Sequence, residues 1–72
     1  MTDMPITELV LTGGEHLRVE GDPHAVETVL LSAARGSIME LAWLIEAETG
    51  LRVGVNPEHV LMLRALGTGS AH

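Results

Sequence analysis

The chain of 72 residues lacks cysteine, phenylalanine and tyrosine, and Trp43 is its single aromatic residue. The absence of cysteine excludes disulfide bonds and thiolate metal sites, and it leaves the redox compartment open. A domain of this size buries only about 60% of the surface that its unfolded chain exposes, so such domains usually require disulfides, a metal or oligomerisation. We therefore expect a homodimer or a larger homo-oligomer.

Positive charge is also scarce, with four Lys plus Arg against ten Asp plus Glu and a formal net charge of -6. Sequence-independent binding to nucleic acid depends on many phosphate contacts, and base stacking depends on aromatic side chains. Nucleic acid is therefore a disfavoured partner. The first residues show no basic region followed by an apolar run, and no apolar stretch approaches the roughly 18 residues of a membrane span. We expect a cytoplasmic protein with no membrane partner.

The motifs of common catalytic and cofactor sites are missing as well. No two of the four histidines have the HxH or HxxxH spacing of a local metal site. No serine lies in a Gly-x-Ser-x-Gly sequence, and the Gly13-Gly14 pair precedes a predicted strand, whereas a phosphate loop precedes a helix. We predict that the protein is not an enzyme and has no cofactor, no metal and no catalytic residue.

A short segment of the sequence occurs twice. LRVEGDP at 17–23 recurs as LRVGVNP at 51–57, and each copy follows a turn that contains glycine. The similarity is either a structural half-repeat or a coincidence of common residues. A three-residue hairpin loop favours glycine at its third position. With Gly14 there, the loop is 12–14, Leu9 faces Leu17, and Glu8 forms a cross-strand pair with Arg18.

The second copy predicts a hairpin of the same type. With Gly50 at the third loop position, the loop is 48–50 and Glu46 faces Arg52. Ile45 then faces Val53, and Trp43 faces Val55. This register places Trp43 on the apolar face of the sheet, so we interpret it first as a core residue and second as an interface anchor.

The stretch SIMELAWLIEAETG at 37–50 allows two interpretations. As a helix, it has Ser37 and Glu40 at the spacing of a capping box. As a strand, it alternates, and one face carries an unbroken apolar series: Met39, Leu41, Trp43, Ile45 and Ala47. The hairpin register favours a strand, and a helix over residues 38–48 is the alternative.

The segment at 23–35 is the clearest helix. Asp22 is a favourable N-cap, Pro23 suits the first helical position, and Gly36 suits the C-terminal end. Leu31 lies on the polar side of this helix and is a candidate contact for a partner. After Asn56 and Pro57 we favour one helical turn at 57–59 and a buried strand at 60–66, with a helix over 56–66 as the alternative.

The run LIEAETGLRVGVNPEHVLMLRA resembles a strand–turn–strand–short turn–strand pattern of small actinobacterial proteins. The first half, ELVLTGGEHLRVEGDPHAVETVL, resembles the strand–turn–strand–helix ending of flagellar FlbD-type proteins. Together the two resemblances cover most of the chain, although the order of the halves differs from the flagellar family. They imply a fold and bring no catalytic motif.

The sequence thus predicts a single α+β domain at 6–66 with the order β-β-α-β-β-β and flexible tails at 1–5 and 67–72. We expect an antiparallel curved sheet or a small barrel with one helix. Because one helix cannot cover two apolar faces, the remaining face is expected to form an interface. Its candidate residues are Leu31, Met39, Leu41 and Trp43.

The predicted function is that of a non-enzymatic protein-interaction or self-assembly module, in which the partner is a second copy or another protein. The alternative is a small oligomeric regulatory protein that binds nucleic acid through the four arginines of the chain: Arg18, Arg35, Arg52 and Arg64.

Overall fold

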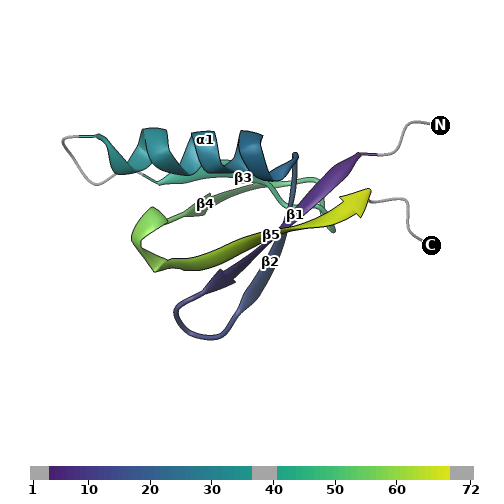
Figure 1. Ribbon diagram of the computed structural model, residues 1–72, viewed down its shortest axis with the longest axis horizontal. Coiled ribbons are helices and arrows are strands. Elements are labelled where there is room, and N and C mark those ends of the chain that lie inside the picture. Colours follow the sequence, from purple (N-terminus) through teal and green to yellow (C-terminus); the bar gives the residue numbers. More distant parts are fainter. Residues whose placement is uncertain (1–3, 37–40, 69–72) are drawn as a thin grey trace.

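The computed structural model describes residues 4–36 and 41–68 and has the predicted α+β element order (Figure 1). Its elements are β1 (Pro5–Leu11), β2 (His16–Glu20), α1 (Pro23–Ala34), β3 (Ala42–Ile45), β4 (Arg52–Val55), the 3-10 helix η1 (Pro57–His59) and β5 (Val60–Thr68). The strands begin one residue before and end two residues after the predicted body at 6–66.

The α+β class with antiparallel strands and one helix is confirmed, but the strands form two sheets that are not closed into a barrel. One sheet has the order β2-β1-β5, and the other contains β3 and β4. The two sheets meet at an isolated bridge between Val19 and Glu46, next to a bond from Ala47 N–H to Arg18 O of 2.8 Å. Beyond this point hairpin β1–β2 diverges from β3 and β4 (Figure 1), which leaves the barrel open.

The first hairpin has the predicted register. Leu9 faces Leu17, and the Leu11 N–H donates to Glu15 O at 2.8 Å, which closes the three-residue loop 12–14. Alternation along β1 turns Thr7 and Leu9 toward the core, and both are fully buried. The hydroxyl of Thr7 donates to Gly21 O at 2.9 Å, so this buried polar group is satisfied.

The second hairpin has a register one residue away from the prediction. The Glu46 N–H donates to Leu51 O, and the Gly50 N–H donates to Glu46 O, both at 2.8 Å, so the loop spans four residues, 47–50. Trp43 therefore faces Gly54, whereas Val55 was predicted. A shift of one residue exchanges the two faces of a strand.

This shift decides which residues of β3 are buried. Ala42 and Leu44 face the core, whereas Trp43 is 53% exposed. The strand prediction is confirmed for 42–45, and a helix over these residues is wrong. Trp43 as a core residue is also wrong. The predicted strand began at 37, and its first residues, 37–40, lie outside the described part of the chain.

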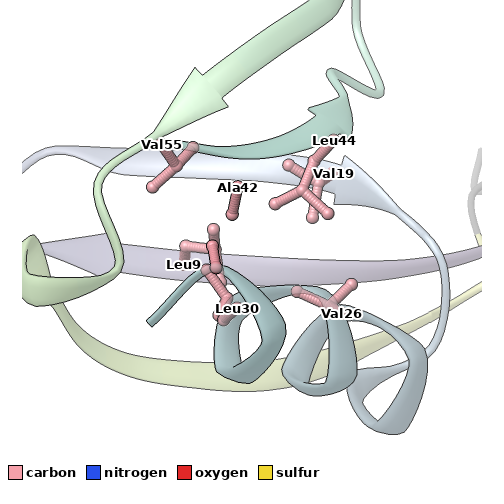
Figure 2. Packing of buried hydrophobic residues seen from close by; sticks show 8 residues of the cluster. Leu9, Val19, Val26, Leu30, Ala42, Leu44 and Val55 are labelled. Atoms are coloured by element: carbon pink, nitrogen blue, oxygen red, sulfur yellow. The ribbon is translucent and has the colours of Figure 1, made fainter. Parts of the chain in front are cut away.

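Helix α1 begins as predicted, because the Asp22 carboxylate accepts a hydrogen bond from Ala25 N–H at 2.7 Å and Pro23 occupies the first turn. The residues of its inner stripe are Val26, Leu30 and Ala33. They pack against β1, β2, β3 and β4 in one core, as Figure 2 shows for the larger side chains. In the described residues, no helix combines the length and apolar character that a membrane crossing requires.

The second copy of the repeat also ends in a cap. The Asn56 side chain accepts a hydrogen bond from Glu58 N–H at 2.9 Å, and Pro57 opens η1. The chain then enters β5 at Val60, so the predicted turn and strand are confirmed and the helical alternative is wrong. Because β5 pairs with β1, the last strand returns to the first sheet, and the two halves of the chain become interleaved.

Candidate interaction site

Strand β5 is one of the two edge strands of its sheet and the longest strand of the described chain. Its nine residues pair with β1 on one side, and no strand of the described residues lies on the other side. At about 3.4 Å per residue, this edge is roughly 30 Å long. The prediction that 60–66 is a buried strand is wrong, because much of β5 is exposed.

The hydrogen bonds of the first hairpin determine which residues of each strand in this sheet bond to which neighbouring strand. The Leu11 N–H donates to Glu15 O at one end, and the Gly21 N–H donates to Pro5 O at the other, at 2.8 and 2.9 Å. Residues of β1 with odd numbers therefore bond to β2. In an antiparallel sheet the residues between them turn their backbone groups the opposite way, toward β5.

The same alternation of hydrogen bonds identifies the backbone groups of β5 that point away from β1. Glu8 of β1 is the register partner of Arg64, so Arg64 directs its N–H and C=O to β1. Its two neighbours, Leu63 and Ala65, direct their groups away from β1 to the free edge. An unpaired row of donors and acceptors is a ready template for another strand.

Two bulges bound the regular part of this edge. The register with β1 shifts between Ile6 and Thr7 and again between Val10 and Leu11, which places one additional residue of β5 at each point. The additional residues are Leu66 and Leu61. Three large apolar side chains of β5 are substantially exposed: Leu61 at 67%, Met62 at 48% and Leu66 at 43%. Bulges of this kind limit the length over which an edge can pair.

The face of this sheet that turns away from the core is polar at its centre. The outer face consists of Ile6, Glu8, Val10, His16, Arg18, Glu20, Met62 and Arg64, by their register. Glu8 is only 8% exposed. Its carboxylate accepts from Arg64 Nε at 2.9 Å and lies 3.1 Å from His16 Nδ1. The prediction that Glu8 pairs with Arg18 is therefore wrong for the side chains, although their register is right.

The Glu8 network joins three strands, β2, β1 and β5. The hydrogen bond from His16 lowers the pKa of the Glu8 carboxyl below its ordinary value, and the bond and charge of Arg64 lower it further against the opposing effect of burial. An ionised carboxylate only accepts, so His16 Nδ1 carries the hydrogen of this bond. The Arg64 charge at the edge is thereby neutralised within the same molecule.

The four arginines of the predicted nucleic-acid site do not gather on one face of the described chain. Arg18 and Arg64 lie on the outer face, and Arg18 forms an exposed ion pair with Glu48 at 3.3 Å. Arg35 caps the end of α1, and Arg52 lies on the other sheet. Its guanidinium carbon lies 5.1 Å from the centre of the Trp43 ring.

The predicted interface residues are exposed where the structure describes them: Leu31 on α1 at 48%, and Leu41 and Trp43 beside or in β3 at 45% and 53%. Met39 lies outside the described residues. Trp43 covers Gly54, because a Cβ built on Gly54 would lie 3.1 Å from the indole ring. With Gly54 on one side and Arg52 near its ring, Trp43 makes several contacts within its own hairpin.

A groove of about 480 Å³ lies where the two sheets diverge. Its walls come from β1, β2 and β4, and its lining residues are Leu11, Glu15, His16, Leu17, Val53, Gly54, Val55 and Asn56. In the described residues no three His, Cys, Asp or Glu side chains gather closely enough to hold a metal ion. The groove is mainly apolar and offers no arrangement of nucleophile and base.

The edge of β5 was not predicted as a site from the sequence. An apolar run such as VLML is typical both of a strand buried on two sides and of an edge that a partner covers. Arg64, directly after this run, was the available signal, since a charged residue is a common feature of edge strands. No protein-family model, no curated protein and no solved structure matches the chain.

Proposed function

We propose that the protein is a non-enzymatic self-assembly module whose contact is the free edge of β5. The single observation behind the proposal is a nine-residue edge strand whose backbone groups at Leu63 and Ala65 pair with no strand of the described residues, with exposed apolar side chains beside them. Pairing of edges supplies hydrogen bonds to backbone groups that water alone satisfies in a single copy. A second strand also covers apolar surface, which stabilises a small domain.

Charge favours a second copy as the partner. The chain carries a net charge of -6, yet the segment 60–68 contains no acidic residue. The charged residue of this segment is Arg64, which Glu8 neutralises. Two copies that approach by this edge therefore keep their acidic residues out of the contact. Like charges placed directly opposite each other would oppose the pairing.

The experiment is sedimentation equilibrium over a range of protein concentrations, with one edge variant and one control. Ala65→Pro removes an N–H that faces the free edge and leaves the bonds to β1 in place, so self-association should be lost while the fold remains. Leu41→Ser alters an exposed apolar residue of the other sheet and should leave association unchanged. A monomeric wild type from micromolar to millimolar concentration would overturn the proposal.

Trp43 provides a second measurement on the wild type. Association through β5 leaves the exposed indole in water, so its emission should stay constant as the protein is concentrated. A blue shift together with association, and its loss in Leu41→Ser, would assign the interface to the β3–β4 sheet and the predicted residues Leu31, Leu41 and Trp43.

The nucleic-acid alternative finds less support, because Arg18 and Arg64 are both paired with glutamates. Retention of mixed DNA and RNA at low salt, with a steep loss as salt is added, would reverse this ranking. Another protein as the partner and a cytoplasmic location stay predictions of the sequence.

A further inference from the structure

The direction in which each backbone N–H and C=O group of β5 points restricts how two copies can pair. This inference rests on the proposed self-assembly and asks which register it uses. In a symmetric antiparallel pair, each residue faces the residue at an equal distance on the other side of the two-fold axis. The free groups belong to Leu63 and Ala65, so the axis passes through Leu63, through Ala65, or through Arg64 between them.

An axis through Arg64 places two guanidinium groups directly opposite each other on the outer face. Arg64 would then be in a pair without hydrogen bonds, in which Cα atoms are only about 4.5 Å apart. Like charges at this position destabilise a sheet. Each Arg64 keeps its bond to Glu8 at 2.9 Å, but the two side chains still compete for the same space.

An axis through Ala65 places the contact beside a bulge. Leu66 is the additional residue of that bulge, and it would have to face Arg64 of the second copy. The overlap would also leave Leu61 and Met62, two of the exposed apolar residues of the edge, at its outer limit. This register therefore covers less apolar surface than the others, and its centre lies where the strand is irregular.

An axis through Leu63 separates the two arginines and places neither bulge next to the axis. Arg64 then faces Met62 of the second copy, so the guanidinium groups are separated and the arginine stem lies on an apolar side chain. Leu61 faces Ala65 of the second copy, and Val60 faces Leu66. The overlap extends over 60–66, and the additional residues of the bulges, Leu61 and Leu66, lie two and three positions from the axis, whereas Leu66 would be next to an axis through Ala65.

We infer that the protein forms a homodimer in which β5 pairs with β5 of a second copy in an antiparallel register centred on Leu63. The two three-stranded sheets become one sheet of six strands, with β1 and β2 of each copy outside β5, and both helices lie on the same side. The axis pair is hydrogen-bonded, with two bonds between the Leu63 backbones.

This contact closes at two copies. It uses the same edge of both molecules, which is the property of an isologous interface. The opposite edge of the sheet, β2, is occupied in part by the bridge between Val19 and Glu46. The inference is therefore of a dimer and excludes a growing fibre.

The absence of cysteine makes disulfide mapping a direct test. In the inferred register the two Leu63 Cα atoms are about 5.5 Å apart, which suits a disulfide bond. Leu63→Cys should therefore form a covalent dimer under mild oxidation, roughly tenfold or more faster than Ala65→Cys. Ala65→Cys is the matched control on the same strand, because its copies would be four residues out of register.

Each other outcome overturns the register in a recognisable way. Faster crosslinking of Ala65→Cys assigns the axis to Ala65. Crosslinking of the double variant Leu63→Cys/Ala65→Cys, with neither single variant active, assigns it to Arg64. A dimer in sedimentation with no crosslink in any variant removes β5 from the interface. A wild type that stays monomeric contradicts the proposed function itself.

Hydrogen exchange on the wild type keeps the inference testable if Leu63→Cys fails to fold. The Leu63 and Ala65 amides face the free edge and should gain protection as concentration rises. The Met62 and Arg64 amides already face β1 and should change much less. Equal protection of all four amides would contradict edge pairing.

Discussion

The two hairpins share a Leu-Arg-Val segment near their second strands and turn the same face of those strands to the core, yet β3 of the second hairpin buries the face opposite to the predicted one. Each has a glycine with positive φ at the end of its loop, Gly14 at 87° and Gly50 at 74°. Each continues with Leu-Arg-Val and ends at an Asp-Pro or Asn-Pro cap. The first loop has three residues and the second has four. This one residue determines whether the register matches the sequence prediction.

The shared motif therefore does not fix the loop length, and so it leaves the register of the first strand open. In the first hairpin, Leu9 and Val19 face the core and are fully buried. In the second, Ala42 is 1% exposed, and Trp43 beside it lies outside. A small side chain fits beneath the helix at this position. In the full sequence the core therefore selects the four-residue loop 47–50, because the predicted loop 48–50 would turn the indole inward.

The largest effect is expected for Leu9→Ala in the first hairpin. Leu9 is fully buried at the centre of the core, so its truncation should cost about 3–5 kcal/mol. A chain of this length has a total stability of only about 4–11 kcal/mol. Urea denaturation should show a variant that is partly or wholly unfolded. A loss below about 1 kcal/mol would contradict the burial of Leu9.

Truncation of side chains along β3 is expected to have the next largest effect. Leu44 faces the core and is 7% exposed, whereas Ile45 faces outward opposite Arg52. Leu44→Ala should cost about 2–4 kcal/mol, and Ile45→Ala about 1 kcal/mol. The predicted three-residue loop reverses this order, since it buries Ile45. Thermal unfolding of the two variants, measured together, distinguishes the registers.

The physical reason for the wrong register is the presence of apolar residues on both faces of this segment. Leu41, Trp43 and Ile45 alternate with Ala42 and Leu44, so period-two alternation alone cannot identify the buried face. In the first hairpin, polar Glu8 lies beside Leu9 and the pattern is unambiguous. The buried face of β3 was therefore determined by tertiary packing, because the local sequence pattern fits either face.

Alanine substitution in the first loop should have an intermediate effect. Gly14 has a φ of 87°, and a residue with a Cβ in this region loses about 1–2 kcal/mol. Gly14→Ala should therefore lower the free energy of unfolding by about that amount. Gly13→Ala is the matched control, because its Cβ would approach only the Glu15 side chain at 3.5 Å. Equal losses would remove the turn argument that placed Leu9 opposite Leu17.

Deletion of Glu48 should have a small effect, although it gives both hairpins the same loop length. The closing residues Glu46 and Leu51 can be retained around a three-residue loop that ends in Gly50. The main loss is the exposed ion pair with Arg18, worth at most about 1 kcal/mol. Trp43 emission should stay that of an exposed indole. A strongly blue-shifted emission would mean that the register had slipped to the predicted one.

The candidate site was less predictable than the fold. The helix, its Asp22 cap and the first hairpin follow from local rules, because capping and turn residues act on near neighbours. The edge position of β5 depends on which strand pairs with β1, and Glu8 bonds to a residue 56 positions away. Neither contact has a local signature, so the pairing of Glu8 with Arg64 was not predictable from the hairpin.

The smallest expected effect is a pH dependence that comes from Glu8 of the first hairpin and its two partners, His16 and Arg64. The hydrogen bonds from His16 and Arg64 hold the pKa of Glu8 below its ordinary value of 4.5. Above that value Glu8 is ionised in both states, and its contribution to stability is complete. As the pH falls below it, the unfolded chain binds a proton first, so stability decreases until the folded carboxyl also titrates.

Glu8→Gln should be less stable than wild type at pH 7, and the difference should narrow toward pH 3 in urea denaturation. Glu15→Gln, in the same hairpin, is the control and should follow the wild type. If the difference in free energy of unfolding between Glu8→Gln and wild type stays constant over this range, the Glu8 network does not titrate. The two hairpins would then differ in the packing of their side chains alone.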